Sequence, residues 1–392
     1  MPAFGTESLE EARGALERTA AALSVIDVET LCAGATSGIS HGIDERFPWL
    51  RARRTARFAV ECALLDLAAR RRGLSLRALL AEEDGGAAEA DAQASVAVNG
   101  VIGMGSPEAS AEAAVRLVSD GYGCLKMKVG SASLEEDIAR LRAVRMAVPE
   151  EVLLRLDANG AWDFAMAEEA LREFALYDVE YVEQPVAAEF TNELAALSAL
   201  GIVAVAADES AQDLDEARVL LARGGADVFV IKPMAAGGLV ESRRFAREAA
   251  GAGRDVVFTS LVDSAVGRNA VAQLCASLPT MRRHHGLATG DFFLDDTSVD
   301  HIEDGHLILP EEPGIGVTPR LMFENSLLSA NASRWPERRA LIDGERSWTW
   351  AELHAAARGV ARRLSREYGV RPGDTVATLL GNTGGHEIGR AH

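Results

Sequence analysis

The sequence predicts an α/β protein in which a closed (β/α) barrel follows an amino-terminal helical segment. Short runs rich in β-branched residues alternate with amphipathic helices at a spacing of roughly 25 residues, which is typical of repeated βα units around a parallel sheet. Eight such runs favour a closed barrel over an open doubly wound sheet. No GxGxxG run follows the first strand, so a dinucleotide-binding fold has little support.

Helices are expected ahead of the barrel, within residues 6–33 and 52–82. The first begins near Thr6 and Glu10, which resemble a helix capping box. The second contains an arginine run followed by Gly73, a combination suited to a helix C-terminus. A polar linker then leads into the barrel.

The predicted strands of the barrel follow in order, with helices between them. Amphipathic helices are expected at residues 134–148 and 215–225, and the second closes on Gly224. The strands are expected at residues 95–103, 124–130, 153–160, 179–185, 203–210, 228–233, 256–264 and 284–290.

The composition argues against several classes of partner. The net charge of −19 disfavours nucleic acid and anionic membranes, because both need a basic protein face. No apolar segment reaches the length of a membrane span, and the N-terminus has no basic leader before an apolar run. The four cysteines lie in separate apolar stretches, as expected in a reducing compartment. We therefore expect a cytoplasmic enzyme acting on a small molecule, of open oligomeric state.

Lysine is restricted to three positions in this chain. Among 40 basic residues, only Lys126, Lys128 and Lys232 are lysine, and all three lie on predicted strands. Arginine stays protonated in proteins, whereas a lysine in a desolvated site can lose its proton and act as a base. Residues 126 and 128 also share one side of a strand. Chance survival in an arginine-rich chain is the plainer explanation, but the strand positions favour a functional one.

Polar side chains mark the ends of successive predicted strands. In order they are Lys126 and Lys128, Asp157 with Asn159, Glu183, Asp208 with Glu209, Lys232, and Thr259 with Ser260. In a barrel these ends converge on the carboxyl-terminal face, where active sites lie. Neighbouring carboxylates repel one another unless a cation lies between them, and hard oxygen ligands suit Mg²⁺. Periodicity alone does not say whether Asp208 or Glu209 binds the ion.

Lysines on both sides of a carboxylate-bound Mg²⁺ indicate a definite chemistry. A substrate carboxylate on the ion has a more acidic α-proton, and a lysine whose pKa is lowered by the nearby ion can remove that proton. The predicted site therefore suits proton abstraction next to a carboxylate.

Five motifs resemble the muconate-lactonising subgroup of the enolase superfamily, and they agree with it in order, spacing and residue type. They are KMK at 126–128, LDANGAW at 156–162, EQP at 183–185, DES at 208–210 and IKP at 231–233. The resemblance covers about residues 6–320. It implies a (β/α)7β-type, TIM-like barrel preceded by a helical capping domain.

The resemblance also implies roles for individual residues. The Mg²⁺ ligands, which could also hold Mn²⁺, would be Asp157, Glu183 and Asp208. Lys128 and Lys232 would face each other across the substrate, and the charge of Lys126 would lower the pKa of Lys128. A lysine base near Mg²⁺ is the known pattern of this superfamily. Residues expected to contact the substrate are Asn159, Thr259, Ser260 and Gly286.

The sequence of the last two predicted strands and the residues after them differs among members of the subgroup that act on different substrates. Residues 258–276 and 286–296 resemble o-succinylbenzoate synthases, the dehydratases of menaquinone biosynthesis. Dipeptide epimerases usually receive the substrate's amino group on an aspartate-rich segment at the eighth strand, whereas GLATG at 286–290 contains no acid and the nearest one, Asp291, comes late. The resemblance implies loss of water from a succinyl-hydroxycyclohexadiene carboxylate to give o-succinylbenzoate. Lys128 would remove the α-proton and protonate the departing hydroxyl, while Lys232 stays charged.

Two alternatives stay open. An N-acylamino acid racemase or dipeptide epimerase of the same subgroup would use Lys128 and Lys232 as acid and base on opposite faces of the substrate. An inactive, truncated remnant is the second alternative, because both ends of the chain depart from the family pattern.

Three further polar residues lie near the end of the predicted barrel. His284 and His285 precede the eighth strand without an Asp-His spacing, so a structural pair is favoured over a catalytic base. Arg268 follows the seventh strand and could either hold a carboxylate or cap a helix.

The amino-terminal end departs from the family pattern. Members begin with a small β-sheet that completes the cap and carries a mobile lid, and most of this sheet is expected to be absent here. Because a lid excludes water and completes the site, its loss would affect turnover more than metal binding. Residues 34–49 could still supply a second loop.

The carboxyl-terminal end differs in charge from the rest of the chain. Residues 331–392 contain ten arginines and seven acidic residues, a net charge of +3 against −22 elsewhere. Residues 333–382 resemble the start of acyl-adenylating CoA ligases such as o-succinylbenzoate-CoA ligase, without the phosphate-binding loop. Trp335, Trp348 and Trp350 should therefore be more exposed than Trp162 of the barrel. The expected domains are an incomplete capping domain at 1–90, the barrel at 91–325 and a truncated, inactive ligase fragment at 326–392.

Overall fold

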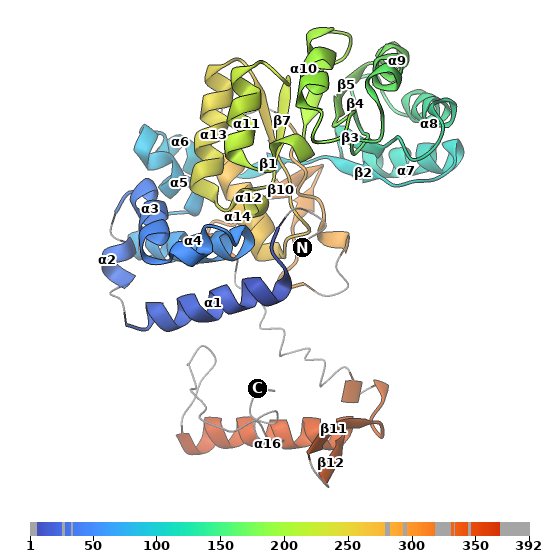
Figure 1. Ribbon diagram of the computed structural model, residues 1–392. Coiled ribbons are helices and arrows are strands. Elements are labelled where there is room, and N and C mark those ends of the chain that lie inside the picture. The colour runs from blue at the N-terminus through green and yellow to red at the C-terminus, as the bar shows by residue number, and fades with distance from the viewer. Residues whose placement is uncertain are drawn as a thin grey trace. The chain divides into compact units, whose positions relative to one another are not determined.

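The computed structural model describes residues 6–25, 28–32, 34–278, 283–292, 296–317, 331–332, 334–343 and 346–368. Two compact units make up the chain (Figure 1). The larger comprises residues 1–295 and 299–317, and the smaller comprises residues 296–298 and 318–392. The predicted boundary between residues 325 and 326 lies outside the described residues.

The larger unit is built on a parallel sheet of seven strands. In spatial order these are β2 (Gly100–Ile102), β3 (Cys124–Lys128), β4 (Leu153–Asp157), β5 (Val179–Glu183), β6 (Val205–Ala207), β7 (Val228–Ile231) and β8 (Asp255–Phe258). Burial of their apolar side chains holds the strands together. The register places Lys128 beside Asp157 and Asp157 beside Glu183, so the charged ends of β3, β4 and β5 are neighbours.

The eighth predicted strand closes the sheet through two bridges rather than a full strand. The amide of Asn99, just before β2, donates to the carbonyl of His285 at 3.0 Å. The amide of Gly286 donates to the carbonyl of Phe258 on β8 at 2.8 Å. This segment therefore joins the two edges of the sheet, and the predicted (β/α)7β-type barrel is confirmed.

The first predicted strand, residues 95–103, is divided between two sheets. Its first part is β1 (Ser95–Ala97), which pairs antiparallel with β10 (His306–Ile308). β10 in turn pairs with β9 (Ile302–Glu303). Only the second part, β2, joins the barrel. The sequence could not indicate this division, because β1 finds its partner more than 200 residues further along the chain.

Helices cover the outer side of the barrel strands, as Figure 1 shows. Serine or aspartate caps begin several of them, including Ser106, Ser133, Asp163 and Asp213, whose side chains accept backbone amides of the first turn. The helices are α7 (Pro107–Ser119), α8 (Leu134–Ala147), α9 (Phe164–Phe174), α10 (Thr191–Ala199), α11 (Leu214–Ala222), α12 (Pro233–Ala236), α13 (Leu239–Gly251) and α14 (Ala265–Ala276), with short 3-10 helices at Ala175–Tyr177, Glu209–Ala211 and Gly290–Phe292.

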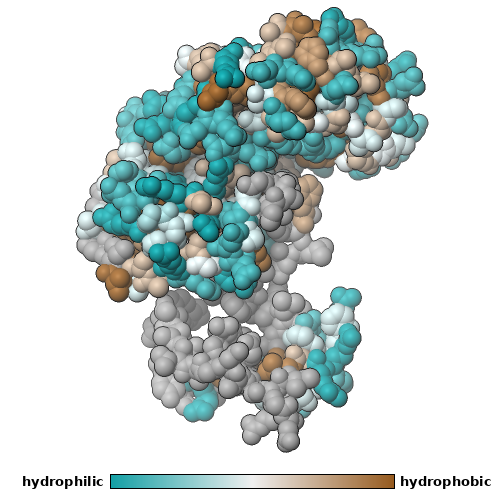
Figure 2. Space-filling model, viewed as in Figure 1, coloured by the Kyte–Doolittle hydropathy of each residue, from teal (hydrophilic) through white to brown (hydrophobic). Residues whose placement is uncertain are grey.

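The amino-terminal helices form a cap that packs on the barrel. They are α1 (Leu9–Leu23), α2 (Val28–Cys32), α3 (Thr36–Arg46), α4 (Arg54–Arg72), α5 (Leu76–Ala81) and α6 (Ala87–Asp91), with 3-10 helices at Pro48–Leu50 and Glu82–Asp84. Figure 2 shows that hydrophilic residues predominate on the visible face of these helices. None of the helices described in the chain is long and apolar enough to cross a bilayer.

The cap departs from the sequence prediction in two details. The capping box of α1 is formed by Ser8 and Glu11, not by Thr6 and Glu10, because Ser8 is the residue three positions before a glutamate at the start of the helix. Residues 34–49, expected as a loop, are mostly the helix α3. Gly73 ends α4 at φ +66°, as predicted.

A buried carboxylate links the cap to the barrel. Glu61 on α4 is fully buried and accepts the amides of Leu239 and Val240 at the start of α13. Ser40 and Arg57 also donate to Glu61, at 2.7 and 3.2 Å. Because the N-terminus of a helix attracts negative charge, this contact fixes the cap against the segment that follows β7.

The smaller unit contains a hairpin and one long helix. The hairpin is β11 (Arg339–Asp343) and β12 (Arg346–Thr349), and the helix is α16 (Trp350–Tyr368). Trp335 is exposed as expected, but Trp348 and Trp350 are half-buried, like Trp162 of the barrel. The expectation of greater exposure is therefore wrong for these two residues, because they pack against a small apolar cluster on α16.

Candidate active site

Lys126 joins two carboxylates at the mouth of the barrel. Its Nζ lies 2.8 Å from Oδ2 of Asp157 and 2.7 Å from Oε1 of Glu183. The three residues are neighbours because β3, β4 and β5 pair in register, and both carboxylates are buried. This bridging position of Lys126 was not anticipated from the sequence.

Lys128 lies on the same side of β3 and is more accessible. Its Nζ is 2.7 Å from Oδ2 of Asp157 and 2.6 Å from Oδ1 of Asn159. The amide group of Asn159 also donates to Oε1 of Glu209 at 3.0 Å. Asn159, expected to contact substrate, therefore has its side chain engaged by Lys128 and Glu209.

Lys232 forms an ion pair with Asp208. Lys232 follows β7 and Asp208 follows β6, so adjacent strands bring them together. Gln184 holds the segment that carries Asp208, because its fully buried Oε1 accepts the amides of Asp208 and Ser210 at 3.0 and 3.1 Å. Sequence reasoning did not single out Gln184, although a glutamine directly after a strand-end acid could have indicated it. Its positive φ of +40° is evident only in the structure.

The electrostatics of the mouth reflect crowded carboxylates. Burial alone would lower the pKa of Lys126, but Glu183 and Asp157 outweigh it and hold that pKa well above its ordinary value. Burial, followed by the charges of Asp157 and Asp208, raises the pKa of Glu183. Burial would also raise the pKa of Asp157, but Lys126 and Lys128 lower it. Lys126 therefore stays charged, but its attraction for Glu183 is outweighed by burial and by the charges of Asp157 and Asp208.

These residues fit a divalent metal in chemistry. Oε2 of Glu183 is buried and has no hydrogen-bond partner among the described residues, and such an oxygen is costly unless a cation or donor meets it. A hard cation with oxygen ligands would satisfy it. However, in the part of the chain that the structure describes, no three acidic, histidine or cysteine side chains lie close enough to hold one ion. Our further expectation, that Asp157, Glu183 and Asp208 lie close enough to share one ion even without metal, is therefore wrong, because lysine ammonium groups lie against each of them.

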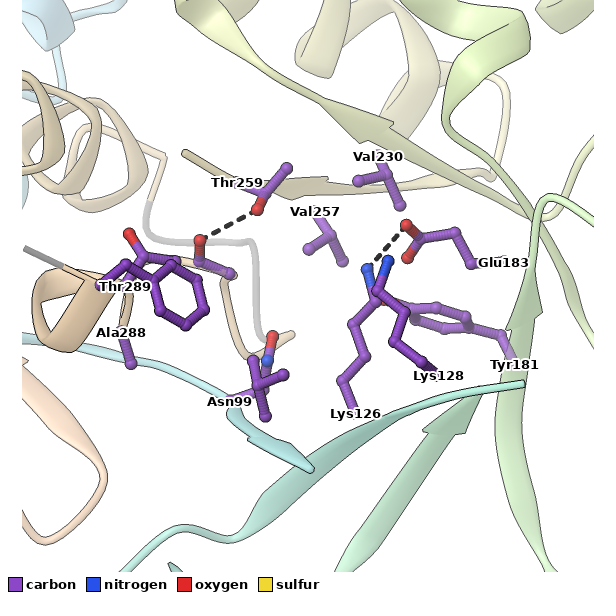
Figure 3. A pocket seen from close by; sticks show the side chains of 13 residues that line it. Asn99, Lys126, Lys128, Tyr181, Glu183, Val230, Val257, Thr259, Ala288 and Thr289 are labelled. Carbon is purple, nitrogen blue, oxygen red and sulfur yellow. Dashed lines mark hydrogen bonds and ion pairs between the residues drawn. The ribbon is translucent and has the colours of Figure 1, made fainter. Parts of the chain in front are cut away.

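A cavity of about 150 Å³ opens at this cluster. Figure 3 shows Lys126, Lys128 and Glu183 above Tyr181 at one end, and Thr259 and Thr289 at the other. The remaining lining is mainly apolar or backbone: Asn99, Val101, Val230, Val257, Gly286, Ala288 and Phe292. The cavity therefore has one charged end and one end of hydroxyl and apolar groups.

Two of the four expected substrate contacts line this cavity. They are Thr259 and Gly286, and the hydroxyl of Thr259 donates to the carbonyl of Gly286 at 2.9 Å. Ser260 is not among the lining residues. Its hydroxyl lies 2.7 Å from the hydroxyl of Thr289, and Thr289 does line the cavity. The sequence reasoning missed Thr289, although it belongs to the GLATG segment.

His285 has a structural role, as expected, whereas Nδ1 of its neighbour His284 is buried without a hydrogen-bond partner among the described residues. His285 is buried, and its Nδ1 accepts the amide of Phe258 at 3.0 Å. Burial, with a further contribution from Arg155, lowers the pKa of His285 to about 3. Burial likewise lowers the pKa of His284. A neutral, buried imidazole that accepts a backbone amide is a packing element rather than a base for substrate.

Arg268 holds a carboxylate of the protein itself, that of Asp300. It is buried on α14, where its Nε lies 2.5 Å from Oδ2 of Asp300 and its Nη1 donates to the carbonyl of Asp263 at 2.5 Å. Arg268 is not among the residues that line the cavity. Its guanidinium thus ties the loop after β8 to residues near position 300.

Comparison with known proteins gives the family. Residues 109–322, more than half of the chain, match the family described as "Enolase C-terminal domain-like". The chain therefore belongs to the enolase superfamily, whose members typically bind Mg²⁺. Residues 328–386 match a second, shorter family segment, "AMP-binding enzyme".

Individual relatives have different activities. The chain is 30% identical over 269 residues to an o-succinylbenzoate synthase of Desulfotalea psychrophila, covering 68% of each protein. It is 33% identical over 229 residues to a hydrophobic dipeptide epimerase of Enterococcus faecalis, covering 58% of this chain and 62% of that one. The crystal structure of the Enterococcus faecalis V583 dipeptide epimerase superposes with a TM-score of 0.70 at 28% identity, covering 80% and 86% of the two chains.

Proposed function

We propose that this protein is a Mg²⁺-dependent o-succinylbenzoate synthase, which removes water from a succinyl-hydroxycyclohexadiene carboxylate. The observation that carries the proposal is the cavity with two unlike ends. Lysines and a carboxylate occupy one end, whereas the opposite wall, as far as the structure describes it, presents hydroxyl and apolar groups and no carboxylate. None of the described residues of that wall would offer an acidic partner to a substrate amino group. Relatives named as o-succinylbenzoate synthases support the proposal.

The proposed metal ligands are Asp157, Glu183 and Asp208. The unpartnered, buried Oε2 of Glu183 supports this assignment, because a carboxylate oxygen in that state needs a cation or a donor. Mg²⁺, or Mn²⁺ in its place, supplies charge that makes the α-proton of a bound carboxylate more acidic.

The proposed base is Lys128, which lines the cavity directly. A neutral amine at Nζ takes the α-proton of the substrate. The same group then gives that proton to the departing hydroxyl, so that one water leaves and the ring becomes aromatic. Asn159 holds the amine from one side. Lys232 keeps its proton and stabilises negative charge on the substrate carboxylate, and Lys126 stays charged between Asp157 and Glu183.

Residues around the far end would hold the rest of the substrate. Thr259 and Gly286 line the cavity, and we assign them direct contacts. Ser260 acts through the hydroxyl of Thr289. Phe292 adds an apolar surface next to them.

A racemase or epimerase is the second candidate. The relatives that favour it are the Enterococcus faecalis dipeptide epimerase and an N-succinyl-L-Arg/Lys racemase of Bacillus cereus, which is 30% identical over 222 residues. In that reaction Lys128 and Lys232 would both transfer protons at Cα, one on each face of the substrate.

Two parallel incubations separate the two candidates. The full chain is mixed in D₂O with Mg²⁺ and either the cyclohexadiene carboxylate or an N-succinylamino acid. We expect the ultraviolet absorbance of an aromatic product from the first substrate. Deuterium at Cα of the second without any aromatic product would contradict the synthase assignment, and no reaction with either would contradict both.

We also propose three domains, with boundaries at 1–90, 91–325 and 326–392. The cap helices, the barrel strands and the hairpin with α16 support this division. We propose that the last segment resembles the start of a CoA ligase without carrying ligase activity, and its match to "AMP-binding enzyme" supports the resemblance.

A further inference from the structure

The turn after β8 contains a strained residue three positions after Thr259, which lines the cavity. Val262 has φ +58°, in the left-handed region that β-branched residues avoid. The other non-glycine residues described with positive φ are Asn159, Asp178, Gln184 and Asp304, none of which is β-branched. Such a conformation persists only where the surrounding structure holds it, and it is often found at functional sites.

The neighbouring residue, Asp263, holds this turn. Its carboxylate is buried, and Oδ1 accepts the amide of Leu261 at 2.8 Å. The carbonyl of Asp263 accepts Nη1 of Arg268, which fixes the turn from its other side. Gly267 leaves room for this packing, since a Cβ there would lie 2.9 Å from Cβ of Asp263.

The shape of Asp263 matters more than its charge. Oδ2 is buried without a hydrogen-bond partner among the described residues. Burial also raises the pKa of Asp263 to about 6, so the surroundings do not favour the charged form. What the turn uses is therefore the acceptor at Oδ1, which an uncharged amide of the same shape could provide.

The turn carries one wall of the cavity. Thr259 lines the cavity, and its hydroxyl donates to the carbonyl of Gly286 (Figure 3). Ser260 contacts the hydroxyl of Thr289 on the same wall. A change in the path of residues 261–263 would therefore move the hydroxyl groups that face the lysines across the cavity.

We propose that Asp263 is a positioning residue: it holds the turn 259–264 in its strained form and so keeps Thr259 and Thr289 in place at the far wall. Its function in binding rests on the synthase activity proposed above. The proposal assigns Asp263 no contact with substrate and no proton transfer.

The test combines substitutions at the strained position and at the residue that holds it. Asp263→Ala removes the acceptor, and we expect KM for the cyclohexadiene carboxylate to rise roughly tenfold, with a smaller change in kcat. Asp263→Asn keeps the acceptor and should stay within about threefold of the unaltered protein. Val262→Gly removes the strain, because glycine adopts this φ freely. Combined with Asp263→Ala, it should restore most of the lost affinity.

Asp178→Gly is the matched control. Asp178 has φ +52° at the opposite, amino-terminal end of β5, so the change relieves similar strain away from the cavity. It should not restore KM in the Asp263→Ala background. Equal restoration by Val262→Gly and Asp178→Gly would show that only overall stability matters, and would overturn the proposal.

Hydrogen exchange of residues 259–264 gives a reading that is independent of activity. We expect faster exchange in Asp263→Ala, and slower exchange again after adding Val262→Gly. Unchanged exchange would overturn the proposal. If Asp263→Ala does not fold, Asp263→Ser takes its place, since its shorter side chain loses the contact with Leu261. Should the unaltered protein leave the cyclohexadiene carboxylate intact, the synthase proposal fails, while the exchange data still decide whether Asp263 holds the turn.

Discussion

The two ends of the barrel use similar charged residues for different purposes. At the amino-terminal ends of the strands, Arg155 donates to Glu180 at 2.6 Å and to the carbonyl of His284 at 2.7 Å. Glu180 also pairs with Arg283, which donates to Asp255 at 2.7 Å. At the carboxyl-terminal ends, lysines replace the arginines. Each group keeps one buried polar atom without a partner in the described structure, Nη2 of Arg155 in the first and Oε2 of Glu183 in the second.

The difference follows from the chemistry of the two cations. A guanidinium stays charged and holds several acceptors at once, so it suits a permanent network. An ammonium is a compact charge that can lose its proton, so it suits a site where protons move. Arg155 and Asp157 are only two residues apart on β4, yet they belong to these two different systems.

Replacing a lysine of the carboxyl-terminal end by arginine, the cation of the amino-terminal end, should have the largest effect on turnover. Lys128→Arg should lower turnover by about 10³-fold or more, because a guanidinium cannot accept the α-proton. Lys232→Arg keeps the charge and should retain part of the activity if a single base does all proton transfer. The measurement is the rate of aromatic product formation. Loss of deuterium exchange at Cα of an N-succinylamino acid with both variants would favour the racemase mechanism, and full activity of Lys128→Arg would contradict either mechanism.

The reverse exchange at the amino-terminal end is the control. Arg155→Lys should leave kcat within a few fold, because Arg155 does not line the cavity and meets it only through the ring of Tyr181. It should lower the free energy of unfolding by about 1–3 kcal/mol, since lysine cannot make both contacts of the guanidinium. Urea denaturation checks the second value.

Substitution of a carboxylate at the two ends should change the Mg²⁺ affinity differently, by a smaller factor than the change in turnover expected for Lys128→Arg. Asp157→Asn should weaken Mg²⁺ binding about 10- to 100-fold while the barrel stays folded, because an amide oxygen is a weaker ligand than a carboxylate. Glu180→Gln, on the neighbouring strand but in the arginine network, should leave the affinity unchanged. Calorimetry measures both. Equal affinities for the two variants would remove Asp157 from the ligand set.

His285, whose Nδ1 accepts the amide of Phe258 at the end of β8, should make the stability of the barrel sensitive to acid. Its pKa is depressed in the folded protein to about 3, so only the unfolded chain takes up this proton between about pH 6.5 and 3. The associated stability is fully present above pH 6.5 and is lost as pH falls. Between pH 7 and 5 the loss should be about 2 kcal/mol. Urea denaturation should show this loss relative to His285→Asn, and parallel pH dependences would contradict the assignment.

Removal of the smaller unit should have the smallest effect. Ending the chain after Ser326 should leave the melting temperature of the larger unit nearly unchanged, because the hairpin and α16 have their own apolar cluster. Calorimetry of the shortened chain checks this. A drop of many degrees would show that the two units stabilise each other.

Much of the barrel could be predicted from local sequence patterns. Residue spacing predicted which acids and lysines end the strands, and parallel register then makes Lys128, Asp157 and Glu183 neighbours. The same reasoning could not predict the partners of each charge. It placed the carboxylates around one ion, whereas Lys126 lies between two of them, because side-chain rotamers rather than spacing decide these contacts.

Features that depend on distant partners were not predicted. The division of residues 95–103 depends on β10, far along the chain, and the half-buried state of Trp348 depends on α16. Asp263 also escaped notice, since neither its burial nor the strain at Val262 has a sequence signature. Packing between residues far apart in the sequence determines the division of residues 95–103, the burial of Trp348 and the surroundings of Asp263.

The central claim is that the carboxyl-terminal mouth holds a metal ion where lysines now meet the carboxylates. The most direct measurement is a crystal of the full chain grown with Mn²⁺, with anomalous diffraction used to locate the ion. We expect one strong peak bonded to Asp157, Glu183 and Asp208, with Lys128 turned towards the cavity. A barrel mouth in which the three lysines keep their carboxylates and no peak lies among them would contradict the claim.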